Sequence, residues 1–281
     1  MTASTDGAAG LRPFGVAELL DGAVRTVRGN LRTVLIISAP FAVVRTVSTA
    51  LLQMGLSGST STLSLTLLDL VLVVGALGTV LSGLLAPVFT DELLGRRLTA
   101  RQSLARVGWR WVLLVVLAVL IAVPETAGMF ALGIGGLWLW GVWAVAAPAL
   151  VVERMRPFAA LGRSFNLVRG EFWRTWGVRA LGFLLTTVLG FFVAIPFQVL
   201  AALLSDFNPF DSTAGNPAYP TLFVWISAIG GLASALLLGP VTAAIDALLY
   251  VDLRMRREGL DIALSLPPEP QSGQPAAVSA W

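Results

Sequence analysis

Residues 110–152 read RWVLLVVLAVLIAVPETAGMFALGIGGLWLWGVWAVAAPALVV, and this stretch decides the fold class. After Arg110, its one charged side chain is Glu125. Because a spanning helix needs about 20 consecutive apolar residues, the stretch is long enough to cross a bilayer twice. The polar segment Pro124–Glu125–Thr126, with Gly128 after it, is where we expect the chain to turn. The stretch therefore predicts a helical hairpin in a membrane.

The other apolar parts of the chain follow the same pattern. Stretches of spanning length lie at about 33–53, 63–88, 110–130, 132–152, 176–204 and 221–249. The 281-residue chain is 56% hydrophobic and 12% charged, with a mean hydropathy of +0.83, which is far more apolar than a soluble domain. We expect an all-α integral membrane protein with six transmembrane helices, arranged as three hairpins in one domain over residues 11–264. The polar ends, 1–10 and 265–281, are expected to be disordered.

The arginines predict the orientation in the membrane. All 19 basic residues are arginine, and most of them lie before the first span, after the second and fourth spans, and after the sixth. The alternate loops, around 54–62, 124–131 and 205–220, contain no arginine. By the positive-inside rule, both termini and the basic loops are cytoplasmic. We therefore expect a multi-pass protein of the bacterial cytoplasmic (inner) membrane.

Three basic segments are expected to form amphipathic helices in the cytoplasmic interface. In the first, at 14–31, apolar and charged residues fall on opposite sides at helical spacing. The second begins at Thr99, with Gln102 at the spacing of a capping box. The third begins at Pro157, a favoured first-turn residue. The expected apolar stripe of the second helix is Ala100, Leu104, Val107 and Trp111, and that of the third is Phe158, Leu161, Phe165, Val168 and Phe172.

Arginines on the basic segments are the candidate lipid-binding residues. A guanidinium stays protonated and suits phosphate groups, and basic side chains at the cytoplasmic surface are attracted to anionic headgroups. The candidates are Arg25, Arg28, Arg32, Arg101, Arg106, Arg163, Arg169, Arg254, Arg256 and Arg257. Nucleic acid is not an expected partner, because the arginines flank apolar segments and form no soluble basic domain. A membrane-protein partner or a homo-oligomer stays open.

Arg45 and Asp69 form a candidate polar pair inside the membrane. Arg45 lies about 20 Å of helix beyond Arg32, and Asp69 lies early in the next, antiparallel span. A buried ion pair that fixes the register of the first hairpin is the favoured interpretation. Arg45 could also extend toward the outer headgroups. A third alternative is a ligand or ion pathway, with Gln198 of the fifth span as a polar neighbour.

Several kinds of catalytic and metal site are excluded by composition. The chain contains no cysteine, histidine or lysine, so it lacks thiolate nucleophiles, the usual general base and the commonest metal ligands. Glu92, Glu153 and Asp246 each follow a small-residue–proline step, at Pro87, Pro148 and Pro240, by five or six residues. They are expected to neutralise arginines rather than to bind a metal. We expect no catalytic residue and no cofactor.

Short sequence matches suggest an internal repeat. RPF occurs at 12–14 and 156–158, and VRGN at 27–30 matches VRGE at 168–171. One interpretation is a unit of one interfacial helix followed by a membrane hairpin, used three times. The alternative is that membrane hairpins of this kind simply look alike.

Three segments together resemble a known family. They are LRPFGVAELLDGAVRTVRGNLRTVL at 11–35, APALVVERMRPFAALGRSFNLVRGEFWRTWGV at 147–178 and GPVTAAIDALLYVDLRMRREGLDIAL at 239–264. They are similar to the bacterial, largely actinobacterial, glycerophosphoryl diester phosphodiesterase membrane domain. The resemblance implies a membrane domain without a defined role. It transfers no catalytic residue, because the family's separate catalytic domain needs histidine and this chain has none.

These observations favour a non-enzymatic membrane protein, an accessory or scaffold component that interacts with anionic lipids or membrane partners. The alternative is a transporter or lipid-translocating permease with a polar site around Arg45, Asp69 and Gln198.

Overall fold

The computed structural model describes residues 14–55, 69–93, 95–207 and 219–259. Within these ranges the chain is helical and has no strand. Six helical segments are long and apolar enough to cross a membrane. The prediction of an all-α, multi-pass membrane protein is therefore confirmed. The predicted disordered ends and the first residues of the predicted second span, 63–68, lie outside the described residues.

Most of the predicted spans match helices of the structure to within a few residues. In chain order the elements are α1 (Val16–Gly29), α2 (Leu31–Gly55), the π-helix η2 (Asp69–Val74), α4 (Gly75–Leu93), α5 (Ala100–Val107), α6 (Arg110–Leu132), α7 (Ile134–Val142), α8 (Ala146–Val152), α9 (Pro157–Val168), α10 (Phe172–Ser205) and α11 (Thr221–Glu258). The last helix continues well past the predicted end at residue 249. Its final turns are amphipathic and packed, with Tyr250 and Leu253 buried.

The predicted turn between the third and fourth spans is misplaced. Helix α6 continues through Pro124 and Glu125, and the chain turns at Gly133, whose φ of 68° suits glycine. Membrane helices tolerate an internal proline. Helix α6 also packs closely on α7 past Glu125: a Cβ on Gly128 would lie only 2.7 Å from the backbone nitrogen of Gly136. Glu125 is therefore inside the bundle, only 7% exposed, and not in an outer loop.

The fourth span is a broken helix. Helix α7 ends at Val142, and α8 begins at Ala146. A break leaves the last carbonyl groups of the first half without helical partners. Ser164 of α9 donates a hydrogen bond to the Val142 carbonyl at 2.8 Å, and the Arg179 guanidinium of α10 donates to the Trp140 carbonyl. Residues from two other elements thus satisfy the break, and one of them carries a charge into the bundle.

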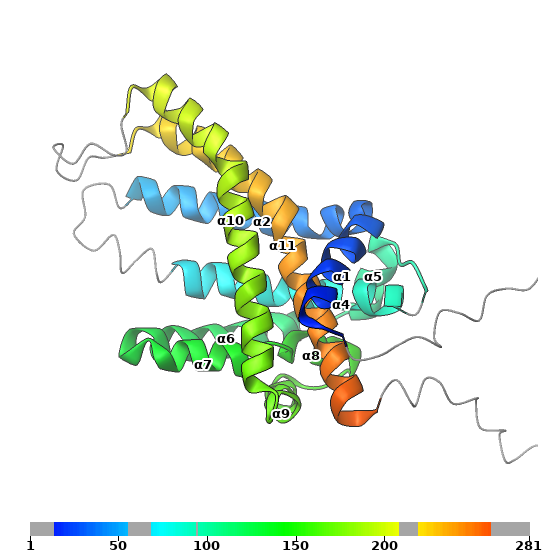
Figure 1. Cartoon of the computed structure of the whole chain (residues 1–281). Coiled ribbons are helices and arrows are strands. Elements are labelled where there is room, and N and C mark those ends of the chain that lie inside the picture. Colours follow the sequence, from blue (N-terminus) through cyan, green and yellow to red (C-terminus); the bar gives the residue numbers. More distant parts are fainter. Residues whose placement is uncertain (1–13, 56–68, 94, 208–218, 260–281) are drawn as a thin grey trace, which may run out of the picture.

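Figure 1 shows how the helices are arranged. Helices α2, α4, α6 and α7 run roughly side by side, while α10 and α11 pair with each other and cross the group at a steep angle. Helices α1, α5 and α9 gather at one end of the bundle, which we call the basic face. At the opposite end, the distal part of the α10–α11 hairpin extends away from the other helices.

The core lies near the basic face, where α4, α8 and α11 meet. Each carries one of the prolines Pro87, Pro148 and Pro240, and all three prolines are buried. An interfacial helix covers each of these three spans: α5 packs on α4, α9 on α8, and α1 on α11. Helices α5 and α9 thus pack on the spans that precede them in the chain. Helix α1, at the start of the chain, packs on the last span, α11. The predicted repeat of one interfacial helix followed by one hairpin describes the order in sequence and stays a prediction.

The capping box at Thr99 and Gln102 and the first-turn Pro157 are both confirmed. The residues of the predicted apolar stripes of α5 and α9 do not all pack on the bundle. Ser103 and Ser164 are fully buried, whereas Leu104 and Phe158 are 45% and 73% exposed. Small residues allow close contact between helices. Helices α5 and α9 therefore pack on the bundle through faces that include Ser103 and Ser164, while Phe158 of α9 points away from it.

Candidate functional site

Charged side chains from three helices meet inside the bundle, in a group that we call the membrane centre: Glu125 of α6, Arg179 of α10 and Asp246 of α11. The Arg179 Nε lies 3.1 Å from Asp246 Oδ1. The same guanidinium lies 4.5 Å from the centroid of the Trp140 ring and donates to the Trp140 carbonyl. Arg179 therefore pairs with one carboxylate and caps the end of α7, where the helix dipole places partial negative charge.

Glu125 differs from the other two members of the membrane centre. Within the described residues its carboxylate has no hydrogen-bond or ion-pair partner, although Arg179 and Asp246 are close enough to act on it electrostatically. It lines an internal cavity of about 40 Å³, whose wall also includes Ser82 of α4, Trp143, Arg179 and Asp246. Ser82 is 1% exposed, and its hydroxyl makes no hydrogen bond of normal geometry within the described residues. The Glu125 carboxylate and the Ser82 hydroxyl, which lies beside Asp246, thus face one space.

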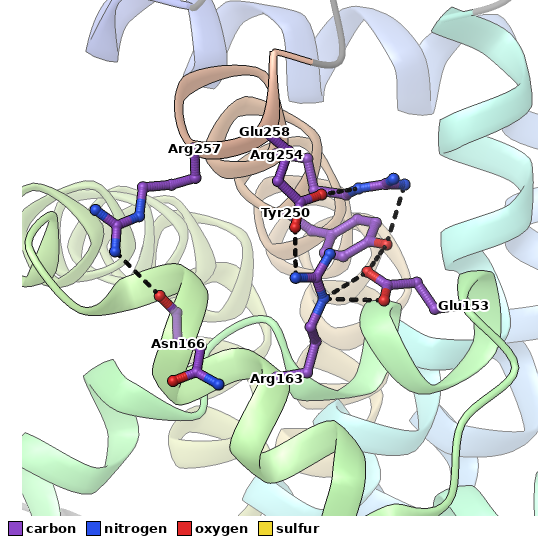
Figure 2. Close-up of polar contacts among 7 residues, drawn as sticks. All are labelled: Glu153, Arg163, Asn166, Tyr250, Arg254, Arg257 and Glu258. Atoms are coloured by element: carbon purple, nitrogen blue, oxygen red, sulfur yellow. Dashed lines mark hydrogen bonds and ion pairs between the residues drawn. The ribbon is translucent and has the colours of Figure 1, made fainter. Parts of the chain in front are cut away.

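A second polar cluster lies at the basic face, and we call it the basic-face network: Glu153, Arg163, Tyr250, Arg254 and Glu258 (Figure 2). Arg163 lies between the two glutamates. Its Nε is 2.9 Å from Glu153 Oε2, and a terminal nitrogen of its guanidinium forms an ion pair with Glu258. Tyr250 donates to Glu153 at 2.7 Å, and Arg254 binds Glu258 at 3.0 Å. The hydrogen bond to Glu258, and to a smaller extent that to Glu153, raises the pKa of Arg163 above its usual value. Arg163 therefore stays charged.

Asp252 joins both ends of the described chain. It is fully buried and accepts a hydrogen bond from the Phe14 backbone nitrogen at 2.7 Å. Arg174 and Arg256 both pair with its carboxylate, and both donate to the Phe14 carbonyl. A buried carboxylate needs partners of this kind. These contacts fasten the start of α1 to α10 and α11.

The predicted pair in the first hairpin is only partly assembled. Asp69 begins η2 and is close enough to Arg45 of α2 for an electrostatic interaction. Its carboxylate accepts a 3.3 Å hydrogen bond from Thr49, one turn beyond Arg45, while Arg45 is exposed. Gln198 accepts a hydrogen bond from Ser227 of α11 at 3.1 Å. Gln198 thus makes its contact within the α10–α11 hairpin, whereas Arg45 belongs to α2 and Asp69 to η2.

The ten candidate arginines divide into two groups. Within the described residues, five have carboxylate partners: Arg25, Arg106, Arg163, Arg254 and Arg256. Arg257 donates to the Asn166 carbonyl (Figure 2). The remaining four are exposed, and no ion pair joins them to another described residue: Arg28, Arg32, Arg101 and Arg169. These four are free to meet an external anion.

The expectation that acidic residues after the prolines neutralise arginines is confirmed for two of them. Glu153 pairs with Arg163, and Asp246 with Arg179. Glu92 accepts a hydrogen bond from Asn30 and lies near Arg97, while its neighbour Asp91 pairs with Arg106 at 2.6 Å. Among the described residues, no group of three or more acidic, histidine or cysteine side chains is arranged to hold a metal.

The membrane centre is the feature that sequence reasoning missed. Arg179 is a single arginine within a predicted span, which is the same signal that singled out Arg45. The sequence predicts Glu125 in a turn and Asp246 near the interface. Their proximity depends on how three helices cross, and no local spacing shows it. Comparison with known proteins finds no matching family model, no matching curated protein and no matching solved structure.

Proposed function

We propose that the chain is a non-enzymatic accessory or scaffold protein of the bacterial cytoplasmic membrane, which binds anionic lipids at its basic face. The observation that carries the proposal is the set of four exposed arginines without a partner among the described residues: Arg28, Arg32, Arg101 and Arg169. The resemblance to the glycerophosphoryl diester phosphodiesterase membrane domain is consistent with a membrane role and carries no activity.

Exposed aromatic residues support a lipid-facing role for the same surface. Trp109, Phe158 and Trp173 are 68%, 73% and 80% exposed. Tryptophan is enriched where proteins meet the membrane–water interface, and an arginine beside it can reach a headgroup phosphate. In this arrangement the basic face, and with it both termini, is cytoplasmic. The paired arginines then hold the interfacial helices in place, while the unpaired ones recognise lipid.

The α10–α11 hairpin offers a surface for a partner within the membrane. Only 6% of the apolar window of α10 is buried in the chain, and its exposed side chains include Phe183, Leu189 and Phe192. Lipid covers this surface in a monomer, and a membrane protein or a second copy covers it in an assembly.

Native mass spectrometry of the full chain from nanodiscs tests the lipid proposal. Nanodiscs containing phosphatidylglycerol and phosphatidylcholine are compared for the wild type and for a variant with Arg28, Arg32, Arg101 and Arg169 changed to Gln. Because each well-placed arginine contributes about 1 kcal/mol, retention of the anionic lipid falls by about fivefold per arginine. Arg25→Gln, whose arginine already pairs with Asp21, is the control and retains the lipid. Equal retention of both lipids by the wild type would refute the proposal.

Transport is the second candidate function, and the broken fourth span favours it. Transporters commonly use interrupted helices next to a binding site near the bilayer midplane. Here the break at residues 143–145 lies beside the membrane centre and its cavity. The residues that support transport are therefore Glu125, Arg179 and Asp246. The predicted polar site gives less support, because Gln198 contacts Ser227 in the α10–α11 hairpin, whereas Arg45 and Asp69 lie in the first hairpin. Uptake assays in proteoliposomes distinguish transport from lipid binding.

A further inference from the structure

The charges of the membrane centre do not balance. Arg179 supplies one positive charge and is already engaged with Asp246 and with the carbonyl end of α7. The end of a helix adds partial negative charge to that side. Glu125 would add a second full negative charge at 7% exposure. An uncompensated charge in an apolar interior costs several kcal/mol, so a carboxyl group there binds a proton or another cation.

The depth of Glu125 makes compensation by solvent ineffective. It lies fifteen residues beyond Arg110 on α6, about 22 Å along the helix. The charged residues of α4 are Asp91 and Glu92 at its basic-face end, and the one in η2 is Asp69, which lies beside Thr49 of α2, while α7 has none. Arg179 and Asp246 are the charged groups that act on Glu125.

The cavity beside Glu125 has the size and lining of a small polar site. Since about 10–15 Å³ of such space admits one water molecule, its volume of about 40 Å³ is enough for a few waters or one small ion. Two groups in its wall have unused acceptor capacity, the carboxylate of Glu125 and the hydroxyl of Ser82. Asp246 lies beside Ser82. Oxygen atoms from α4, α6 and α11 therefore surround one space.

We propose that this cavity binds one monovalent cation, a proton or a sodium ion, and that Glu125 is the group that takes it. A proton binds to a carboxylate oxygen of Glu125, whereas a sodium ion lies in the cavity between Glu125 and Ser82. Either cation makes the membrane centre electrically neutral. Cation binding at Glu125 requires neither lipid binding at the basic face nor transport.

Two measurements on the purified full chain in detergent distinguish the two cations. Infrared difference spectra across a pH change detect the carbonyl stretch of a buried protonated carboxyl group. Thermal unfolding in sodium chloride and in choline chloride detects stabilisation by sodium, since a ligand that binds the folded state raises the unfolding midpoint. A sodium site raises that midpoint by at least about 2 °C at saturation.

Glu125→Gln is the test variant and Glu92→Gln is its matched control. Both remove one glutamate carboxylate from a spanning helix, but Glu92 contacts Asn30 away from the cavity. We expect the wild type and Glu92→Gln to show either the titrating carboxyl band or the sodium shift, and Glu125→Gln to lose it. If Glu125→Gln folds poorly, Ser82→Ala tests the sodium site, and Glu125→Asp tests for retention of the carboxyl band.

The outcomes decide the proposal. A carboxyl band lost in Glu125→Gln identifies a proton, and a sodium shift lost in the same variant identifies sodium. A wild type with neither signal overturns the proposal, and so does a signal that persists in Glu125→Gln.

Discussion

The two polar clusters of this chain differ in how completely their charges are paired. In the basic-face network, Glu153 and Glu258 share Arg163, and Tyr250 and Arg254 complete their contacts. In the membrane centre, Arg179 and Asp246 pair, but Glu125 has no direct partner within the described residues. A structural network gains from satisfying every group, because each unpaired buried charge is costly. The first cluster therefore holds the helices together, whereas the second contains a buried carboxylate, Glu125, that makes no direct contact with a counter-charge among the described residues.

Replacement of Arg179 by alanine should have the largest effect. The change leaves Asp246, a side chain only 12% exposed, without a counter-charge, and it removes the donor to the Trp140 carbonyl. Loss of one partner of a buried ion pair typically costs about 3–5 kcal/mol. We expect a large fall in the thermal unfolding midpoint, measured by fluorescence-detected size-exclusion chromatography in detergent.

The double variant Arg179→Ala with Asp246→Ala is its control. Without the Asp246 carboxylate, the loss of Arg179 no longer leaves that buried charge without its partner, so part of the lost stability should return. A double variant that is less stable than Arg179→Ala would show that the pair is not the source of the effect.

Replacement of Arg163 by alanine should have a smaller effect, although it removes the hub of the basic-face network. The Arg163 side chain is 23% exposed, so water compensates part of the loss, and we expect roughly 1–3 kcal/mol. The two carboxylates raise the pKa of Arg163, so this contribution is present below the pKa of the unfolded state. It should therefore be constant between about pH 6 and 9. A loss that changes across this range would point to another group.

The fold was predictable because its signals are local. Apolar stretches of spanning length, the arginines between them, the capping box at Thr99 and Pro157 at a helix start can all be read from neighbouring residues. The turn at Gly133 was misplaced because Pro124 and Glu125 look like loop residues in sequence. In the structure α6 continues past both residues, and Gly128 packs against Gly136 of α7 beyond them.

The candidate site was less predictable than the fold. Arg163 and Glu153 are ten residues apart, so an interfacial helix that folds back on the preceding span brings them together. Arg179 and Asp246 are 67 residues apart, and Glu125 comes from a third helix. Their meeting depends on the steep crossing of α10 and α11 over the other helices (Figure 1). Short-range periodicity carries no information about such a crossing.

Glu125→Gln separates the two clusters most directly. Glutamine keeps the shape of glutamic acid and removes the excess negative charge, so we expect the stability to stay within about 1 kcal/mol of the wild type. Glu153→Gln makes the same chemical change in the basic-face network, where the carboxylate accepts from Arg163 and Tyr250. It should cost about 1–2 kcal/mol. Thermal unfolding in detergent measures both, and equal losses would remove the distinction between the clusters.

Replacement of Arg25 by alanine should have the smallest effect and sets the lower end of the scale. Arg25 pairs with Asp21 at 2.7 Å, a shorter distance than that between Arg179 and Asp246, yet the Arg25 and Asp21 side chains are 81% and 70% exposed. Water screens an exposed pair at this helical spacing, so we expect a loss of about 0.3 kcal/mol. Thermal unfolding should barely distinguish this variant from the wild type. A loss comparable to that of Arg163→Ala would mean that distance, rather than burial, decides the strength of these pairs, and the contrast between the two clusters would then need another cause.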